Sequence, residues 1–359
     1  MSIHSKHQAQ NDEVPNIENG SAEAAYSDIV LTSTPPGVDS IDSSLRPKKL
    51  KDYIGQEKIK ENIRIVLEAA KQRNEPPEHI LFYGPPGLGK TTLAHIIAHE
   101  VGAELKSTSG AAIERVGDLA SILTNLNAGD ILFIDEIHRL NKSIEEVLYP
   151  ALESRKLDII LGKGPSARTI QLDLNPFTLI AATTRVSQLS APLRSRFSGG
   201  VFRLDFYTHE DMRTIVGRSA KLLETDVHPE GINVIAARSR FTPRTANYLV
   251  KRVRDYGQVY KKPLSKEVVD QALELIGVDE HGLLHADRDL LRVLIDNFRG
   301  GPVGIGALAS ALSEESETLE EFNEPYLLQI GMIERTPRGR TATLKAQAHM
   351  EKHRGSDTK

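Results

Sequence analysis

Eight consecutive residues, Gly84 to Thr91, have the types and spacing of a phosphate-binding loop, G-P-P-G-L-G-K-T. They follow the apolar run 80–83, which is where such a loop is expected. A glycine-rich backbone can point N–H groups at phosphate oxygens, and a helix beginning near Lys90 adds the positive end of its dipole. The pattern predicts ATP binding, with Lys90 on the β- and γ-phosphates. The alternative is a glycine-rich turn that binds nothing.

The side chains that end this loop predict a second ligand, Mg²⁺. The hydroxyl of Thr91 is suited to complete the shell of a magnesium ion, which takes oxygen ligands alongside substrate phosphates. The following Thr92 is expected to act as a donor at the helix N-terminus. The predicted nucleotide contacts within the loop are Gly87, Leu88, Gly89, Lys90, Thr91 and Thr92.

Two adjacent carboxylates follow a second apolar run, in the sequence I-L-F-I-D-E at 131–136. Parallel sheets place ligands at the carboxyl ends of their strands, so this pair is expected beside the phosphates. Asp135 is predicted to hold Mg²⁺ through water, and Glu136 to orient the water that attacks the γ-phosphate. Without the upstream loop, a solvated acidic turn would explain the same letters equally well.

A third group of polar residues lies in A-A-T-T-R and A-P-L-R-S-R-F. Thr183 and Thr184 end an apolar run, where a hydroxyl can contact water or a phosphate oxygen. Arg194 and Arg196 come soon after, and an exposed arginine can stabilise transition-state charge on a neighbouring subunit's nucleotide. Spacing alone favours surface ion pairs for these arginines. Arg244, on a small helical domain, could likewise reach the γ-phosphate by rigid-body motion, and its alternative is a helix-surface arginine.

These residues need a framework of alternating strands and helices to bring them together. Apolar positions at helical spacing predict a helix around 59–67, and further helices are expected at 92–101 and 144–152. Short apolar runs predict strands at 80–83, 131–134 and 177–182. This order is typical of an α/β fold with a parallel sheet flanked by helices.

Between the acidic and threonine motifs, two apolar-rich runs are separated by glycines and a proline, which predicts a β-hairpin at about 156–174. Exposed Ile159, Ile160 or Leu161 on such an arm would favour aggregation unless a partner covers them. The alternative is a hairpin that packs on its own domain.

The last part of the chain predicts a DNA-binding head. Helices are expected at 287–298, 305–312 and near 316–322, followed by R-T-P-R-G-R, a pattern typical of a winged helix. From Arg335 to the end there are seven Lys or Arg residues and two acidic residues, although the whole chain has net charge −4. Arg335, Arg338 and Arg340 are the predicted phosphate contacts, and such contacts imply binding independent of base sequence. The basic residues from Lys352 onward fit a solvated tail.

Composition limits the class of protein. The 359 residues allow two to three domains, and no apolar run is long enough to span a bilayer. The absence of cysteine excludes disulfides and thiolate metal sites and, with no secretory signal, leads us to expect a cytoplasmic protein. Residues 1–40 have too few large apolar side chains for a core and are predicted to be a disordered extension.

Taken together, the ordered motifs resemble the AAA+ ATPases and, within them, the RuvB family of Holliday-junction branch-migration motors. The resemblance extends from about Leu45 to Arg340. It rests on R-P-K-K-L-K-D-Y-I-G-Q, G-P-P-G-L-G-K-T-T, F-I-D-E-I-H-R-L, A-A-T-T-R, P-L-R-S-R-F, T-P-R-T-A-N, E-P-Y-L and R-T-P-R-G-R. It implies an AAA+ ATPase domain at 41–207, a small all-α lid at 208–278 and a winged-helix head at 279–359.

The resemblance also implies roles for single residues. It makes Thr183 the first sensor, Arg244 the second sensor and Arg196 an arginine finger acting across subunits. The residues that it places near the nucleotide are Leu45, Arg46, Tyr53, Ile54 and Tyr207, together with Glu153, Ser154 and Arg155, a stretch that departs from the family pattern.

For function, the resemblance implies a hexameric ring that pumps duplex DNA and drives branch migration of Holliday junctions. Its implied partners are RuvA, which would cover the hairpin, and the resolvase RuvC. A clamp-loader-like ATPase is one alternative, and it should lack the R-T-P-R-G-R wing. The other is a nucleotide-dependent switch that does not hydrolyse ATP, which would leave Glu136 idle.

Overall fold

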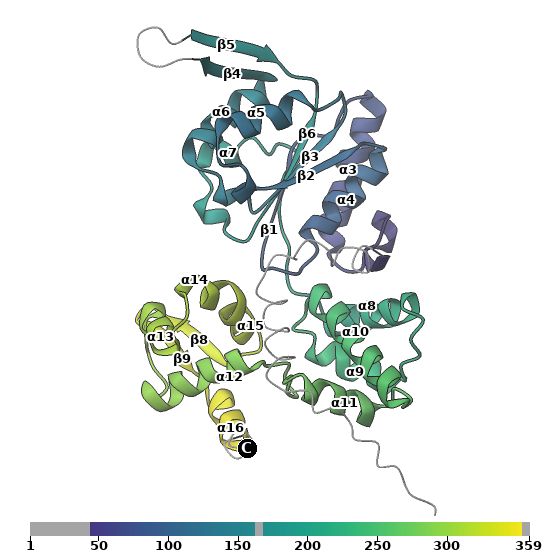
Figure 1. Ribbon diagram of the computed structural model, residues 1–359, viewed down its shortest axis with the longest axis vertical. Coiled ribbons are helices and arrows are strands. Elements are labelled where there is room, and N and C mark those ends of the chain that lie inside the picture. The colour runs from purple at the N-terminus through teal and green to yellow at the C-terminus, as the bar shows by residue number, and fades with distance from the viewer. Residues whose placement is uncertain (1–43, 162–167, 354–359) are drawn as a thin grey trace, which may run out of the picture.

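A computed structural model of the protein describes residues 44–161 and 168–353, with side chains 159–169 outside the described part. The expected disordered extension at 1–40 therefore lies outside the described residues. Among the described helices, none combines the length and the apolar character needed to cross a membrane. The chain forms a sheet-containing domain with a projecting hairpin, and two further domains that lie side by side beneath it (Figure 1).

The first domain is built on a five-stranded sheet in the order β2-β3-β6-β1-β7, with all neighbouring strands parallel. Its strands are β1 (Ile80–Tyr83), β2 (Leu105–Ser109), β3 (Ile131–Asp135), β6 (Thr178–Thr183) and β7 (Gly200–Arg203). The central strands are almost fully buried because helices cover both faces, as is usual for parallel sheets. The predicted strands at 80–83, 131–134 and 177–182 are found, whereas the edge strands β2 and β7 had no clear apolar signal.

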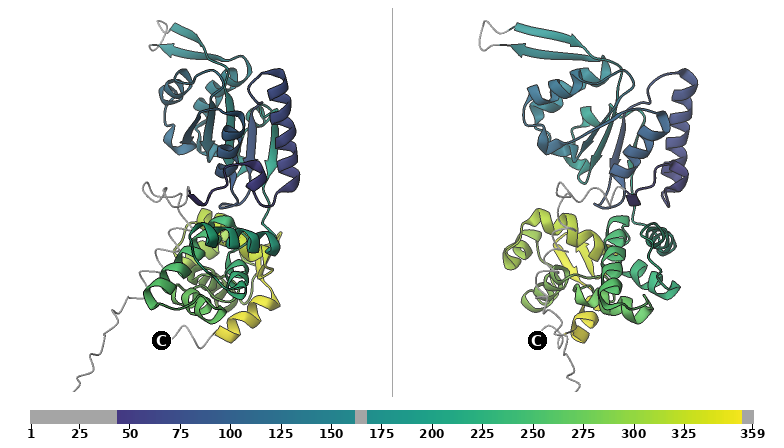
Figure 2. Two further views of the ribbon diagram at one scale, coloured as in Figure 1. Left: turned by 90° about the vertical axis from the view of Figure 1, so that its right-hand side faces the viewer. Right: turned by 45° about the vertical axis from the view of Figure 1, so that its right-hand side comes forward.

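Helices cover the two faces of the sheet in two groups (Figure 2). One apolar core joins β1 and β3 to α3 and α4, through Ile63 and Ile97 among others. A second core packs the opposite face against α5 and α6, through Leu119 and Leu148. The helices of this domain are α3 (Glu57–Arg73), α4 (Lys90–Val101), α5 (Val116–Thr124), α6 (Lys142–Glu153) and α7 (Ala191–Arg194).

A β-hairpin projects from this domain on the side away from the other two domains (Figure 1). It consists of β4 (Lys156–Leu161) and β5 (Arg168–Asp173), paired antiparallel with Leu157 opposite Leu172. Leu157 is fully buried in the second core, which anchors the base of the hairpin beside α6. The predicted hairpin is thus present. The side chains of Ile159, Ile160 and Leu161 lie outside the described part.

The second domain contains four helices: α8 (His209–Leu222), α9 (Pro229–Arg238), α10 (Pro243–Tyr260) and α11 (Lys266–Leu275). It begins with a capping box, in which the Thr208 hydroxyl accepts from the Asp211 N–H at 3.1 Å and the Asp211 carboxylate accepts from the Thr208 N–H at 3.1 Å. Its apolar side chains are continuous with the α3–α4 core of the first domain.

The third domain combines helices with a two-stranded wing and has its own apolar core. Its elements are α12 (His285–Arg292), α13 (Ile305–Leu312), α14 (Ser316–Thr318), α15 (Glu324–Gln329), β8 (Ile333–Thr336), β9 (Gly339–Ala342) and α16 (Leu344–His353). The single helix expected at 287–298 is instead α12 followed by a π-helical turn, Val293–Asn297. A second π-helical turn, Leu319–Asn323, follows α14. The R-T-P-R-G-R segment forms the wing.

A buried ion pair joins the second and third domains. Arg240 donates to Asp287 at 2.5 Å, and Asp287 is completely buried. Asn323 also donates to Asp287, at 2.7 Å. Removing one partner of such a pair would leave an uncompensated buried charge, so the contact fixes the two domains to each other.

Candidate nucleotide-binding site

The phosphate-binding loop joins β1 to α4 at the carboxyl edge of the sheet. Gly84, Gly87 and Gly89 all have positive φ, which side chains rarely adopt. Space is also limiting, because a Cβ at Gly84 would lie 2.5 Å from the Leu204 carbonyl oxygen, and one at Gly89 would lie 2.6 Å from the Tyr53 hydroxyl. The loop is followed at once by α4, whose first-turn residues Lys90, Thr91 and Thr92 have N–H groups without intrahelical acceptors.

Lys90 is buried within this loop. Its ammonium donates to the carbonyl oxygens of Gly84 at 2.8 Å and Pro85 at 2.9 Å. Burial lowers the pKa of Lys90, against the attraction of Glu136 and Asp135, which raises it. The charge of this lysine is therefore poorly solvated, and an anion in the loop would be attracted to it.

Asp135 ends β3 directly beside α4. Its carboxylate accepts from the Thr91 hydroxyl at 3.3 Å. Burial raises the pKa of Asp135, as does the neighbouring Glu136 carboxylate. A hydroxyl and a carboxylate this close offer oxygen ligands of the kind that magnesium takes, so these residues fit the metal that the sequence predicted.

Glu136 is held by three hydrogen bonds to one carboxylate oxygen. The Thr184 N–H and hydroxyl donate at 3.0 and 3.1 Å, and His138 Nδ1 lies at 3.1 Å. Burial raises the pKa of Glu136, but the hydrogen bonds from His138 and the Thr184 N–H outweigh burial and lower it. Glu136 itself has φ of 45°, an uncommon conformation for a non-glycine residue. The carboxylate is thus ionised and fixed in direction.

His138 was not recognised from the sequence, although it lies in the quoted F-I-D-E-I-H-R-L. Its Nδ1 lies 2.9 Å from the Thr183 hydroxyl as well as close to Glu136. The predicted sensor Thr183 is therefore joined to the predicted catalytic carboxylate through this imidazole. The signal available was only that His138 is two residues after Glu136 in a short turn.

Two buried tyrosines lie behind the loop. The hydroxyls of Tyr53 and Tyr207 each lie 3.1 Å from the Leu88 carbonyl oxygen, and the two hydroxyls lie 2.9 Å from each other. Burial raises the pKa of both phenols. Nearby, Leu45 is buried, and Arg218 of α8 donates to its carbonyl oxygen at 2.7 Å. The segment before α3 thus contacts both the loop and the lid.

The other two residues predicted from this segment, Arg46 and Ile54, are both partly buried. Ile54 packs against the first core. Burial lowers the pKa of His95 on α4, and the charge of Arg46 lowers it further, so Arg46 lies close to that helix.

Arg244 is placed against the loop by the first turn of α10. Its N–H donates to the Gly87 carbonyl oxygen at 3.4 Å. A cavity beside the loop is lined by Pro85–Gly87, by Arg244 and Tyr248 of the lid, and by Glu321 of the third domain. All three domains therefore meet at the predicted phosphate site.

Arg196 lies elsewhere in the first domain. It forms an ion pair with Glu153 at 2.8 Å, and its guanidinium lies 4.5 Å from the centre of the Tyr149 ring. Glu153, Arg155 and Arg196 line a separate cavity that contains none of the loop residues 84–91. Ser154 donates to the Pro150 carbonyl oxygen at 3.0 Å as α6 ends. Within one chain, this group is not brought to the phosphate loop.

The three predicted DNA contacts of the wing differ in their surroundings. Arg335 and Arg340 both pair with Glu324, with shortest distances of 2.7 and 2.8 Å. Arg340 also pairs with Glu320, at 3.2 Å, and is largely buried. Arg338 is exposed at the turn between β8 and β9.

Comparison with known proteins agrees with this architecture. Three sequence models match consecutive parts of the chain: the Holliday junction DNA helicase RuvB P-loop domain at 45–204, the RuvB AAA lid domain at 207–279 and the RuvB C-terminal winged helix domain at 280–351. The chain belongs to the RuvB family. It is therefore a P-loop ATPase with a lid and a winged helix, an ATP-dependent Holliday junction helicase. A clamp-loader-like ATPase would lack the winged helix.

Solved RuvB structures are similar over most of the chain. The Thermotoga maritima RuvB Holliday junction branch migration motor is 48% identical, with TM-score 0.79 over 86% of this chain and 98% of that chain. Two point mutants of Thermotoga maritima RuvB give TM-scores of 0.80 and 0.78 at 48% and 47% identity, covering 85% and 86% of this chain and 98% of each mutant.

Proposed function

We propose that this RuvB-family motor binds ATP and Mg²⁺ at the loop 84–91 and acts as a homohexameric ring around duplex DNA. RuvA docks on the hairpin, RuvC resolves the junction, and the complex works in the cytoplasm on Holliday junctions of any base sequence. The observation that carries this proposal is the meeting of the phosphate loop, the paired carboxylates, the lid and the winged helix at one edge of the sheet.

In the proposed reaction, water attacks the γ-phosphorus of ATP and releases ADP and phosphate. Lys90 exchanges its two carbonyl acceptors for phosphate oxygens, and Thr184 and His138 fix the direction in which Glu136 accepts a hydrogen bond from that water. Thr183 contacts His138, which also contacts Glu136, so Thr183 responds to the state of the Glu136 carboxylate. Thr91 and Asp135 would hold Mg²⁺, which would supply positive charge to the phosphates.

Two further arginines complete the proposed site, one from the lid of the same chain and one from a neighbouring subunit. Arg244 approaches the phosphates from the lid, so that hydrolysis changes the lid angle. Arg196 completes a neighbouring subunit's site. Its separation from the loop within one chain, in a cavity of its own, supports a role across the interface. Leu45, Arg46, Tyr53, Ile54 and Tyr207 form the adenine side.

The test is ATP turnover with and without duplex DNA, each with and without RuvA, for the unchanged protein and for Glu136→Gln. We expect turnover to rise with both partners and to vanish in the variant, while ATP binding persists because Lys90 and Thr91 are intact. A matched control is Glu114→Gln, on an exposed surface of the same domain. Turnover indifferent to DNA and RuvA would refute the motor assignment, and turnover that survives in Glu136→Gln would refute the role of that carboxylate.

A further inference from the structure

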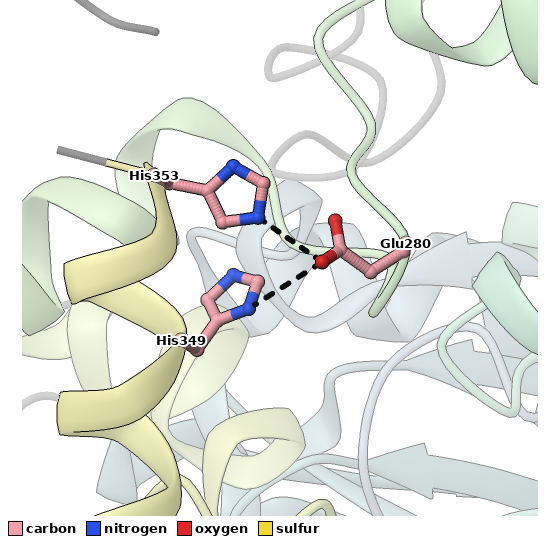
Figure 3. A group of neighbouring side chains, drawn as sticks. All are labelled: Glu280, His349 and His353. Atoms are coloured by element: carbon pink, nitrogen blue, oxygen red, sulfur yellow. Dashed lines mark hydrogen bonds and ion pairs between the residues drawn. The ribbon is translucent and has the colours of Figure 1, made fainter. Parts of the chain in front are cut away.

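Glu280, His349 and His353 form a group of three potential metal ligands outside the nucleotide site (Figure 3). They come from the first and the last residues of the winged-helix domain in the sequence. Glu280 lies just before α12, at the junction with the lid. His349 and His353 are one helical turn apart on α16 and therefore project from the same face. Their side chains converge on the Glu280 carboxylate.

The distances between these ligand atoms suit a single ion. Glu280 Oε1 lies 3.1 Å from His353 Nε2 and 3.9 Å from His349 Nδ1, and the three atoms all lie within 4.8 Å of one another. A tetrahedral zinc ion with bonds of about 2.0–2.2 Å sets its ligand atoms roughly 3.3 Å apart. Rotation of the imidazoles and the carboxylate about their side-chain bonds would bring the longer separation, 3.9 Å, toward that value.

A carboxylate behind the cluster already orients one of the imidazoles. Asp279 Oδ2 lies 2.9 Å from His349 Nε2, which leaves Nδ1 as the atom that faces Glu280. The other oxygen of Asp279 accepts from the N–H groups of His281 and Leu283, each at 2.8 Å, so the carboxylate is itself fixed. Metal-binding histidines usually donate their second nitrogen to such a group.

We propose that Glu280, His349 and His353 form a binding site for a divalent transition-metal ion, of which Zn²⁺ is the best fit. Two imidazoles and one carboxylate are ligands that zinc favours, whereas magnesium prefers oxygen alone. Three protein ligands leave a fourth position for water. The ion would fasten α16 to the lid junction, because its ligands come from the first and last parts of the winged-helix domain.

Lys352 would compete with a metal ion for the Glu280 carboxylate. Its ammonium lies 2.8 Å from Glu280 Oε1, where it neutralises the carboxylate. The Lys352 side chain is 70% exposed, so it can swing into solvent when a cation binds. Removing this lysine should therefore strengthen metal binding, an effect opposite in sign to the removal of a ligand.

The experiment is calorimetric titration of the untagged full-length protein with Zn²⁺ in excess Mg²⁺, which occupies oxygen-only sites, without nucleotide. We expect one strong site per chain. His353→Ala and Glu280→Gln should each weaken it by at least about tenfold, and Lys352→Ala should strengthen it. The control is His285→Ala, which removes an exposed histidine that pairs with Asp289 on α12 of the same domain.

Substitution with Co²⁺ gives a readout of geometry, because tetrahedral cobalt with nitrogen ligands absorbs strongly in the visible range. We expect that absorption in the unchanged protein and in His285→Ala, and its loss in His353→Ala. Thermal melting without metal checks that each variant is folded. If His353→Ala does not fold, Glu280→Gln replaces it as the ligand variant in the cobalt measurement. Equal Zn²⁺ affinity in the unchanged protein and both ligand variants, or no binding at all, would overturn the proposal.

Discussion

Arg185, which follows the two threonines at the end of β6, donates to Glu317 of the winged-helix domain at 3.0 Å. It also forms an ion pair with Glu321, which lines the cavity beside the phosphate loop. The Glu321 carboxylate is close enough to Lys90 to raise the pKa of that lysine, although burial dominates and lowers it. The winged helix is therefore in electrostatic contact with the strand end that carries Thr183 and Thr184.

This contact predicts that Glu321→Gln uncouples DNA binding from ATP hydrolysis. Basal turnover should remain, since the phosphate loop and Glu136 are unchanged. Stimulation by duplex DNA should fall by about fivefold, as expected if the lost ion pair contributes on the order of 1 kcal/mol to the coupling. The measurement is turnover as a function of DNA concentration, with Glu315→Gln on an exposed surface of the same domain as control. Normal stimulation in Glu321→Gln would show that coupling takes another route.

Arg196→Ala should act dominantly in mixed rings. Its partners within the chain are Glu153 and the Tyr149 ring, and the nucleotide contact that we propose is on the neighbouring subunit. Turnover should therefore fall faster than in proportion to the fraction of variant protein. The measurement is a mixing series at constant total concentration, with Arg203→Ala, an exposed arginine on β7, as control. A linear decline would contradict a shared site.

The hairpin can be tested without disturbing the ATPase core. The test is a shortened hairpin, in which a short glycine turn replaces residues 159–170. Leu157 stays in place because it is buried in that core. We expect basal turnover to persist while RuvA binding and its stimulation of turnover are lost, as measured by co-sedimentation and ATPase assay. RuvA binding by the shortened protein would refute docking on this arm.

The sequence predicted most of the fold and the position of the phosphate site because the relevant signals are local. Lys90 and Thr91 are adjacent and begin the helix that follows the loop after one apolar strand, and Asp135 and Glu136 are adjacent at the end of another. The carboxyl ends of the two strands must meet in a parallel sheet. The wing was predicted because the short R-T-P-R-G-R segment follows three expected helices, a pattern typical of a winged helix. The π-helical turns after α12 and α14 could not be predicted, because apolar spacing does not separate them from a continuing helix.

The contacts that join distant segments were not predictable. His138 meets Thr183 across 45 positions, and Arg240 meets Asp287 across 47. Because 26% of the residues are charged, the sequence allows many other ion pairs and does not indicate which of them form. Counting charge near the C-terminus likewise grouped Arg335 and Arg340 with Arg338, although the first two share an ion pair with Glu324. Only the packing of α15 against the wing separates them.

Glu324→Gln should destabilise the winged helix in a pH-dependent way. Burial raises the pKa of Glu324, but hydrogen bonds from Arg335 and Arg340 outweigh burial and lower it. The carboxylate therefore contributes stability above the unfolded pKa of about 4.3, and this contribution is lost as the pH falls toward the lower folded pKa. We expect a loss of about 2 kcal/mol in unfolding free energy at neutral pH, which shrinks below pH of about 4.

Chemical denaturation at several pH values measures that difference, and Glu334→Gln on exposed β8 is the control. A difference that stays constant as the solution is acidified would show that Glu324 acts through packing and not through its charge.

Arg338 and Arg340 of the wing should behave differently when DNA binding is measured. Arg338 is exposed at the hairpin turn, so Arg338→Ala should weaken binding to all duplex sequences equally. It should also reduce the slope of log affinity against log salt by about one. Arg340 is largely buried against Glu324 and Glu320, so Arg340→Ala should mainly lower the melting temperature and change the salt slope less. Fluorescence anisotropy with two unrelated duplexes over a salt series distinguishes these outcomes. A larger change of slope in Arg340→Ala than in Arg338→Ala would mean that DNA phosphates displace the acidic partners of the wing.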